Sequence, residues 1–271
     1  MPHDKKILGL IAGNGKFPFL FAREARNRHY TVIAAAIKGD TSFLLTPFVD
    51  QILWVGPGEL KKLFSFFKQR GVRDVVMAGQ VSPSNLFNDR LAIDEDFRKL
   101  FDALEDRKAD TIFSAVADKL KAEGMELLDS TFLLSGYMAP QGTITKRGPS
   151  ESELLDIEFG RMIAKMMGGI DVGQTVVVKD KAIVAIEAME GTDKTILRGG
   201  VIAQQNAVVV KMSKPKQDVR FDIPVIGPRT LETMAQAKAS CLAVEAGKTL
   251  VIDLDHCIAL ANKYQICIVG A

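Results

Sequence analysis

The chain has 271 residues, more than the ~100–150 residues of a usual domain, so we expect two domains that each bury a core. Lysine and arginine number 35 against 33 aspartates and glutamates, and a net charge of +2 excludes a global positive field for non-specific nucleic-acid binding. The N-terminus lacks the residue order of a signal peptide, and no apolar run approaches the ~18–20 residues of a membrane span.

The first half of the chain alternates continuous apolar runs with helical patterns. The apolar runs predict strands at 5–13, 31–37, 51–56, 72–79 and 125–130, and the helical periodicity predicts helices at 19–28, 58–70, 96–104 and 109–124. Strands that are apolar along their whole length are typical of a parallel sheet covered on both faces. We therefore predict a Rossmann-like α/β domain over residues 1–131.

A linker and a second α/β domain with a mixed sheet are expected next. Residues 132–149 are rich in Gly, Pro, Ser and Thr, which is typical of a connection, so the second domain would span 150–271. Its predicted strands are 175–179 and 182–188, joined as a hairpin by Asp180 and Lys181, then 207–212, 248–253 and 265–270; its predicted helices are 153–167, 230–241 and 256–264. Three cysteines without CxxC spacing fall in the tail and indicate reduced core thiols of a cytosolic protein: Cys241, Cys257 and Cys267.

The helix at 153–167 carries an apolar stripe at helical spacing, formed by Leu155, Phe159, Met162, Ile163 and Met166. We expect this stripe to pack into the core, as most such stripes do. Its methionines would also make an adaptable surface for an apolar ligand.

Gly13-Asn14-Gly15 follows the first strand, and Pro18 suits the first turn of the helix after it. Glycines at this place allow backbone N–H groups and the positive end of a helix to approach a phosphate. The dinucleotide fingerprint is incomplete, because Pro18 stands where its third glycine belongs and no acid ends the second strand, so NAD is disfavoured. A simple strand-to-helix turn is the alternative.

Gly79 and Gln80 end another apolar strand, at what should be the same carboxyl edge of the sheet. Ligands of open α/β folds bind at that edge, and Gln80 offers an amide for a base or a sugar. An ordinary turn that ends a strand is the alternative.

Glu187 alternates with Ile183 and Ala185, so an acid is expected on a face that should be apolar. Burying it is unfavourable unless a cation lies opposite. Thr192 and Asp193 follow at the start of a short helix, where capping and the helix dipole explain them without a ligand. Capping does not explain Glu187.

Lys211 shares a strand face with Ala207 and Val209, and five charged residues follow it at alternate positions: Lys214, Lys216, Asp218, Arg220 and Asp222. An extended backbone would send this mixed row to one side, stiffened at its ends by Pro215 and Pro224. Lysines suit a diphosphate and carboxylates suit Mg²⁺, so the row indicates phosphoryl chemistry. A solvated edge strand is the alternative.

Several catalytic patterns are absent from the sequence. The three histidines have no metal-ligand spacing, which disfavours a His-rich dinuclear phosphatase: His3, His29 and His256. No GxxxxGK[ST] or GxSxG occurs, and the cysteines form no nucleophile constellation.

Four stretches together resemble the LpxI-type UDP-2,3-diacylglucosamine pyrophosphatases of lipid A biosynthesis: 11–18 (IAGNGKFP), 76–83 (VMAGQVSP), 171–193 and 214–230. The resemblance covers nearly the whole chain. It implies a two-domain, Mg²⁺-dependent hydrolase that splits a UDP-sugar diphosphate into UMP and 2,3-diacylglucosamine 1-phosphate. It also implies a homodimer, cytoplasmic and peripheral to the inner membrane.

The resemblance assigns candidate roles by position. Asp218 and Asp222 would be the catalytic pair, with Asp222 favoured. Metal ligands would come from Glu187, Asp193 and Asp222. The residues expected to contact the substrate are Gly13, Asn14, Gly15, Gly79, Gln80, Gln174, Glu190, Gly191, Thr192, Lys211 and Lys214.

By this hypothesis the diphosphate lies between the domains, and a carboxylate orients a water for in-line attack on the sugar-side phosphorus. The acyl chains would use the apolar stripe of 153–167 if that stripe is not core. A non-enzymatic sensor of a nucleotide sugar or lipid precursor is the alternative, and an oxidoreductase is a weaker one.

Overall fold

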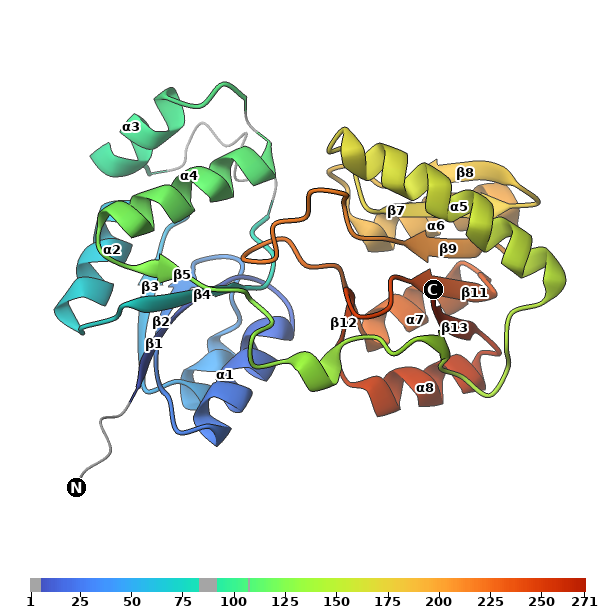
Figure 1. Ribbon diagram of the computed structural model, residues 1–271, viewed down its shortest axis with the longest axis horizontal. Helices are drawn as coiled ribbons and strands as arrows, with labels where there is room; N and C mark the ends of the chain where they lie inside the picture. The colour runs from blue at the N-terminus through green and yellow to red at the C-terminus, as the bar shows by residue number, and fades with distance from the viewer. Residues whose placement is uncertain (1–5, 83–91, 107) are drawn as a thin grey trace. The chain divides into compact units, whose positions relative to one another are not determined.

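The computed structural model describes residues 6–82, 92–106 and 108–271, and its internal contacts divide the chain into two units (Figure 1). Unit 1 comprises residues 1–134 and 218–222, and unit 2 comprises 135–217 and 223–271. The sequence predicts one uninterrupted second domain, whereas the contacts assign the short segment 218–222 to unit 1. Pro83 of the VMAGQVSP stretch lies outside the described residues.

Unit 1 contains a five-stranded, fully parallel sheet in the order β3-β2-β1-β4-β5, which confirms the predicted Rossmann-like sheet. Its strands are β1 (Ile7–Ala12), β2 (Thr31–Ile37), β3 (Gln51–Val55), β4 (Asp74–Ala78) and β5 (Glu126–Leu127). The chain builds outward from β1 to β3 and then returns to add β4 and β5 on the other side. The order therefore reverses between β1 and β4, which is where such folds bind ligands.

Helices cover both faces of the unit 1 sheet (Figure 1). α1 (Phe17–Asn27), begun by Pro18, and the 3₁₀ helix η1 (Phe43–Phe48) lie on one side. α2 (Leu60–Gln69) and α4 (Ala109–Ala122) pack on the other face, with α3 (Glu95–Asp102) beside them. The core on that face is apolar and dominated by α2 phenylalanines such as Phe64 and Phe67.

Unit 2 contains a six-stranded mixed sheet in the order β6-β13-β11-β9-β7-β8, as predicted. Its strands are β6 (Gly142–Thr143), β7 (Thr175–Lys179), β8 (Ala182–Ile186), β9 (Val208–Lys211), β11 (Cys241–Val244) and β13 (Cys267–Gly270). β9, β11 and β13 run parallel, whereas β6 and β7 run antiparallel to their neighbours. A separate parallel pair joins β10 (Val225–Ile226) to β12 (Leu250–Val251).

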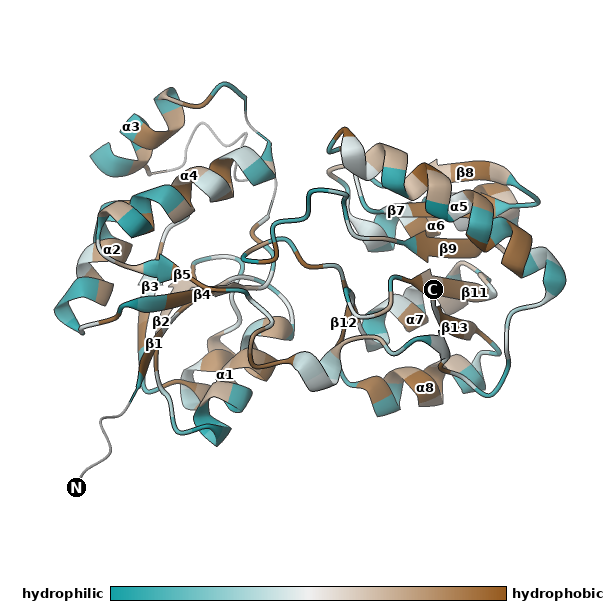
Figure 2. Cartoon of the chain, viewed as in Figure 1, coloured by the Kyte–Doolittle hydropathy of each residue, from teal (hydrophilic) through white to brown (hydrophobic). Residues whose placement is uncertain are grey.

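The unit 2 sheet also has helices on both faces. α5 (Glu151–Gly169) packs on one face, against Val208, Val210 and their neighbours. α6 (Thr192–Ala203), α7 (Pro228–Gln236) and α8 (Leu254–Lys263) pack on the other. A short 3₁₀ helix, η3 (Ser135–Tyr137), opens the unit. Hydrophobic ribbon in Figure 2 is concentrated in the strands between these layers.

The stripe predicted to pack α5 into the core lies largely outside it. Leu155, Met162 and Met166 are each about half exposed. The face of α5 turned to the sheet carries Ile157 and small residues instead, and a Cβ added to Gly160 would lie 2.6 Å from a methyl of Val210. Small residues let the helix approach closely, so the larger apolar residues fall on its outer side. The expectation that the stripe packs into the core is confirmed only for Phe159 and Ile163, which are partly buried against it.

The predicted hairpin is confirmed, with Asp180 and Lys181 both at positive φ in its two-residue turn. Its second strand contains an irregularity, because Val177 pairs with Ala185 while Val178 pairs with Ile183. This β-bulge turns Ile183 toward the α5 side and Ala185 toward the α6 side. The expectation that Ile183, Ala185 and Glu187 share one face is therefore wrong for Ile183.

All three cysteines are buried and none forms a disulfide, as predicted for core thiols. Across the residues that the structure describes, no helix has the length and hydrophobicity needed to span a membrane.

Candidate functional site

A buried cluster of charged and hydroxyl side chains lies at the carboxyl edge of the unit 2 sheet. Lys211 ends β9, Thr175 begins the antiparallel β7, and Glu187 follows β8 directly. Thr192 is the first residue of α6, which leaves the same edge. We call these four residues the Lys211 cluster.

Lys211 is only 6% exposed, and its ammonium has polar partners within the Lys211 cluster. Its Nζ donates to Thr192 Oγ1 at 2.8 Å and to Thr175 Oγ1 at 3.3 Å. It also lies 3.8 Å from Glu187 Oε2, in an ion pair whose two side chains are 8% and 12% exposed. The cation that a buried Glu187 requires is therefore Lys211 of the same chain.

One oxygen of Glu187 remains without a hydrogen bond. Thr192 donates its hydroxyl proton to Glu187 Oε1 at 2.8 Å. Oε2 is buried and accepts no hydrogen bond from the described residues. A buried carboxylate oxygen in this state is costly and fits a site that receives a further cation or donor.

Thr192 does not cap α6, contrary to the capping interpretation. The N-cap is Gly191, with φ 83°, and no described side chain caps the first turn. The hydroxyl of Thr192 instead bonds to Lys211 and Glu187. The α6 N-terminus thus adds its dipole and its first backbone N–H groups to a site that already holds a lysine, which favours an anion.

The other predicted unit 2 residues have protein partners. Glu190 pairs with Arg198 at 2.6 Å, and Asp193 pairs with Arg229 at 2.7 Å. Burial would raise the pKa of Glu190, but the hydrogen bond from Arg198 lowers it overall. Lys214 Nζ contacts Asp171 at 2.5 Å. Gln174 lies one residue before β7, and its backbone carbonyl accepts from the Met212 amide.

A second polar cluster at this edge was not predicted. Glu245, directly after β11, accepts from Lys165 at 2.6 Å, from Lys248 at 2.9 Å and from both the amide and the hydroxyl of Ser213. Burial would raise the pKa of Glu245, but the hydrogen bonds from Lys165 and Ser213 outweigh it and lower the pKa to about 2. These contacts fix the chain immediately after β9, just before Lys214.

In unit 1 the two glycine turns meet at the point where the strand order reverses. Asn14 and Gln80 form an isolated antiparallel bridge, with N···O distances of 2.7 and 3.2 Å. A Cβ on Gly79 would lie 2.5 Å from the carbonyl oxygen of Asn14, and one on Gly13 would lie 2.6 Å from that of Gln80. The prediction that both turns share one sheet edge is confirmed, and Gly13 and Gly79 let them approach each other.

The backbone donors of the first turn are already engaged. Gly13 N–H donates to Ala78 O, Asn14 N–H to Gln80 O, and Gly15 N–H to the side chain of Asn14. Gly15 adopts φ 93°. These N–H groups are therefore directed at protein oxygens rather than at a phosphate, and the turns shape the edge rather than supply its donors.

Segment 218–222 is a turn, not the extended row predicted from its alternating charges. The Asp222 amide bonds to the Asp218 carbonyl at 2.9 Å, and Arg220 forms a bidentate pair with the Asp218 carboxylate. That pair lowers the pKa of Asp218. Lys214 and Lys216 belong to unit 2, whereas Asp218, Arg220 and Asp222 belong to unit 1.

Segment 218–222 is anchored in unit 1 by an apolar and a polar contact. Phe221 packs on Phe113 of α4, with ring centroids 5.6 Å apart, and touches the unit 1 core. The amide and hydroxyl of Ser130 both donate to the Val219 carbonyl. Asp222 therefore has a fixed backbone position within unit 1.

Comparison with known proteins identifies the family. The model of the LpxI N-terminal domain matches residues 7–137, and that of the LpxI C-terminal domain matches residues 140–269. The chain belongs to the LpxI family. A curated relative from Caulobacter vibrioides, named UDP-2,3-diacylglucosamine pyrophosphatase LpxI, is 31% identical over 276 aligned residues, which cover 97% of this chain and 96% of that protein.

Solved structures add only distant likenesses to this LpxI chain. A biotin carboxylase domain from Hydrogenobacter thermophilus 2-oxoglutarate carboxylase gives a TM-score of 0.29 at 12% identity, covering 74% of this chain and 42% of its own. Biotin carboxylase from Campylobacter jejuni gives 0.25 at 11% identity, covering 73% and 42%. Neither carries an argument about function.

The donor set of this LpxI chain allows a magnesium ion without forming a dense metal cluster. Within the described ranges, no three His, Cys, Asp or Glu side chains converge on one point. Mg²⁺ typically takes one or two protein carboxylates and keeps several waters. Glu187 Oε2, buried without a hydrogen bond, fits one such ligand position. The carboxylate of Asp193 is engaged by Arg229.

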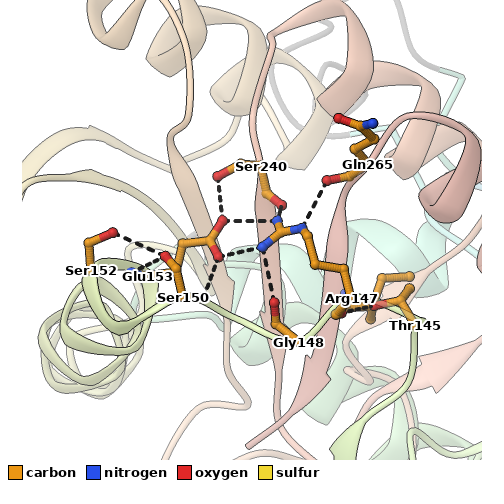
Figure 3. A network of polar contacts seen from close by, with 9 residues as sticks. Thr145, Arg147, Gly148, Ser150, Ser152, Glu153, Ser240 and Gln265 are labelled. Atoms are coloured by element: carbon orange, nitrogen blue, oxygen red, sulfur yellow. Dashed lines mark hydrogen bonds and ion pairs between the residues drawn. The ribbon is translucent and has the colours of Figure 1, made fainter.

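A polar cavity of about 740 Å³ lies at the opposite edge of the unit 2 sheet, where β9, β11 and β13 begin. Figure 3 shows its central network, in which Arg147 forms a two-pronged ion pair with Glu153 and also donates to Ser240 and Gln265 carbonyls. Burial would raise the pKa of Glu153, but hydrogen bonds from Arg147 and Ser240 lower it to about 2. The charges satisfy one another, so we interpret this network as structural.

Proposed function

We propose that this chain hydrolyses the diphosphate of UDP-2,3-diacylglucosamine, giving UMP and 2,3-diacylglucosamine 1-phosphate. Its family membership and near full-length similarity to a relative of that name support the proposal. The observation that carries it is the Lys211 cluster, in which a buried ammonium, a hydroxyl and an uncapped helix N-terminus converge. A diphosphate is an anion that this combination would bind.

In unit 2 the proposed role is electrostatic. The Lys211 ammonium and the first N–H groups of α6 would hold the diphosphate oxygens and stabilise charge that grows on them in the transition state. Thr192 keeps the ammonium oriented, because its hydroxyl accepts from Lys211 while donating to Glu187. Gln174, Gly191 and Lys214 would contribute further substrate contacts near this edge.

In unit 1 the proposed role is to bind the nucleotide and position the water. Gly13, Gly79 and Gln80 lie where the strand order reverses, the expected place for a nucleotide in such a sheet. The carboxylate of Asp222 would accept a proton from the attacking water. The new bond would form to the sugar-side phosphorus, and the bond from that phosphorus to the bridging oxygen would break, so that UMP leaves as a monoester.

We propose Mg²⁺ as the cofactor, with Glu187 as its candidate ligand in unit 2. When bound, the ion supplies neutralisation of the diphosphate charge and a lowered pKa of coordinated water. Lys211 and Arg229 would then hold the carboxylates of Glu187 and Asp193 in fixed orientations.

The lipid part of the substrate also needs a surface. The exposed members of the α5 stripe, Leu155, Met162 and Met166, offer apolar and flexible side chains for acyl chains. We further propose that the protein is cytoplasmic, peripheral to the membrane that holds its lipid substrate, and homodimeric. Chemical cross-linking and light scattering would test the dimer.

A non-enzymatic sensor of the same nucleotide sugar is the rival function, and one assay separates the two. Purified protein is incubated with UDP-2,3-diacylglucosamine, with Mg²⁺ or with EDTA, and UMP is quantified by chromatography. The proposal expects catalytic release of UMP that requires the metal. Stoichiometric binding of intact substrate with no UMP in either condition would establish the sensor instead.

A further inference from the structure

The η1 segment of unit 1 exposes apolar side chains to an unusual degree. Phe43 is 76% exposed, Leu44 is 73% exposed and Phe48 is 36% exposed. Single exposed apolar residues are common on protein surfaces, but three within six consecutive residues form a patch. We call these three residues the η1 patch.

The η1 patch is held in place by specific contacts. The Phe43 ring packs on Trp54 of β3 with centroids 4.3 Å apart, and Phe48 meets Phe19 of α1 at 5.5 Å. Ser42 Oγ accepts from the Leu44 amide. The backbone is thus fixed in a form that projects Phe43 and Leu44 outward, although water offers these side chains no favourable contact.

Basic side chains of α1 flank the η1 patch. Phe19, Arg23 and Arg26 recur at the i, i+4 and i+7 spacing of one helix face. Two of the three touch η1, because Phe19 packs on Phe48 and Arg26 donates to the Pro47 carbonyl at 2.8 Å. Arg23, 56% exposed at its side chain, therefore lies on the face beside the patch. In Figure 2, α1 shows hydrophilic bands alongside its hydrophobic ones.

The exposed charges of segment 16–50, which contains both α1 and η1, are mainly basic. Exposed basic residues in the segment 16–50 are Lys16, Arg23, Arg26, Arg28 and Lys38. Against them, Asp50 is exposed, Asp40 is buried, and Glu24 is mostly buried and paired with Arg23 and Arg28. Apolar tips flanked by exposed arginines complement an anionic lipid surface, where the tips enter the acyl boundary and the cations meet headgroups.

A second protein copy fits the η1 patch less well. Three partly exposed side chains offer roughly 350 Å² between them, judging from the 150–250 Å² of a whole aromatic residue. A standard interface needs about 800 Å² from each partner, much of it apolar at the centre. A membrane has no such requirement, since a few inserted side chains and several cations add up to reversible binding.

We propose that the η1 patch and the adjacent arginines of α1 form a membrane-docking surface of unit 1, specific for anionic lipid. This inference rests on the proposed function only in that a lipid substrate gives the protein a reason to visit a membrane. The binding itself can be measured without any turnover.

The test is flotation of the full chain with extruded vesicles of phosphatidylcholine and phosphatidylglycerol at about 3:1, compared with phosphatidylcholine alone. We expect the wild type to float with anionic vesicles, and Phe43→Ser/Leu44→Ser to lose at least tenfold in apparent affinity. Arg23→Gln should weaken binding severalfold, and raised salt should weaken it similarly. The matched control is Val201→Ser/Ile202→Ser, which removes side chains 82% and 59% exposed at the end of α6 in unit 2 and should bind like wild type.

Three outcomes would overturn the proposal. The η1 patch has no membrane role if the wild type fails to float with anionic vesicles. The same conclusion follows if the Phe43→Ser/Leu44→Ser variant floats as the wild type does. If light scattering shows that this variant has a different oligomeric state from the wild type, the η1 patch belongs to a protein interface. A circular dichroism spectrum and melting curve like those of the wild type must accompany the variant. If vesicle binding behaves as expected but no UMP is released from the detergent-dispersed substrate, the proposed function fails while the docking surface stands.

Discussion

The ammonium of Lys211 lies 2.8 Å from the hydroxyl of Thr192, and this contact ties the last residue of β9 to the first residue of α6. Both residues lie at the carboxyl edge of the unit 2 sheet, and Glu187 completes the arrangement from the end of β8. The helix N-terminus and a buried lysine therefore face the same point. Burying these charged groups is unfavourable for folding, but the arrangement is well suited to binding an anion.

Replacing Lys211 should abolish most turnover. Lys211→Met keeps the length of the side chain and removes its charge, and losing one preorganised donor to a phosphate oxygen should lower kcat/KM by about 100- to 1,000-fold. The variant also leaves Glu187 buried without its cation, which should cost about 3 kcal/mol of unfolding free energy. Steady-state kinetics and urea denaturation measure the two effects.

The double variant Lys211→Met/Glu187→Gln separates these two effects. Removing both charges should restore much of the unfolding free energy, because no buried carboxylate is left unpaired. Activity should remain low. A double variant with near wild-type kcat/KM would show that the Lys211 cluster serves the fold alone.

Asp222→Ala should keep the fold and the affinity for substrate but lose turnover, since Phe221 and Ser130 both anchor the segment in unit 1. Asp218→Ala is the comparison, because Asp218 is held by Arg220. We expect the loss in kcat to be greater for Asp222 than for Asp218. Calorimetric titration measures the affinity of each variant for substrate, and the rate of UMP release at saturating substrate measures kcat. Wild-type turnover by Asp222→Ala would remove this residue from the site.

The contact between the two glycine turns of unit 1 predicts a stability effect. Gly13→Ala should cost about 2–3 kcal/mol, because its Cβ would lie 2.6 Å from a backbone oxygen of Gln80 that cannot move independently. Gly136→Ala is the matched control, since nothing lies within 4 Å of its Cβ position and its φ is not positive, and it should change stability by less than about 0.5 kcal/mol. Thermal unfolding of both variants tests this. Equal melting temperatures would refute the close approach.

The Arg147–Glu153 pair predicts how stability depends on pH. Glu153 has a pKa lowered to about 2 in the folded state, so its ionised form stabilises the fold at pH values above the ordinary glutamate pKa near 4.5. That contribution, about 3 kcal/mol, should be lost as the pH falls from 4.5 toward 2. Glu153→Gln should therefore destabilise the protein at pH 7 and flatten this part of the curve. Glu151→Gln, an exposed neighbour in the same helix turn, should leave the curve unchanged.

The sequence predicted the strands of unit 1 well because they are continuous apolar runs that a parallel sheet requires. The hairpin of unit 2 was equally clear, since two turn residues separate two β-branched runs. β11 was missed, because Cys241–Val244 contains alanine and leucine and follows a good helical pattern without a break. Glu245 was missed with it, since its significance depends on ending that strand.

Other residues were misplaced because their positions depend on packing. Period-2 alternation put Ile183 with Ala185, but a bulge of one residue separates them, and no single-sequence pattern marks the bulge. The sequence predicts the outer stripe of α5 as its core face, because glycine and alanine contribute little to an apolar pattern. In the structure Gly160 and Ala164 face the sheet. The sequence predicts an extended row of alternating charges at 214–222, whereas residues 215–216 and 219–221 form turns and Phe221 packs on Phe113 of unit 1.

Hydrolysis of UDP-2,3-diacylglucosamine in ¹⁸O-labelled water, followed by ³¹P NMR and mass spectrometry, tests the proposed reaction most directly. With Mg²⁺ present we expect UMP without label and 2,3-diacylglucosamine 1-phosphate carrying one ¹⁸O, and we expect EDTA or Lys211→Met to suppress both products. Label in UMP would move the attack to the other phosphorus. Substrate that remains intact with Mg²⁺ and stoichiometric folded enzyme would contradict a pyrophosphatase activity for this chain.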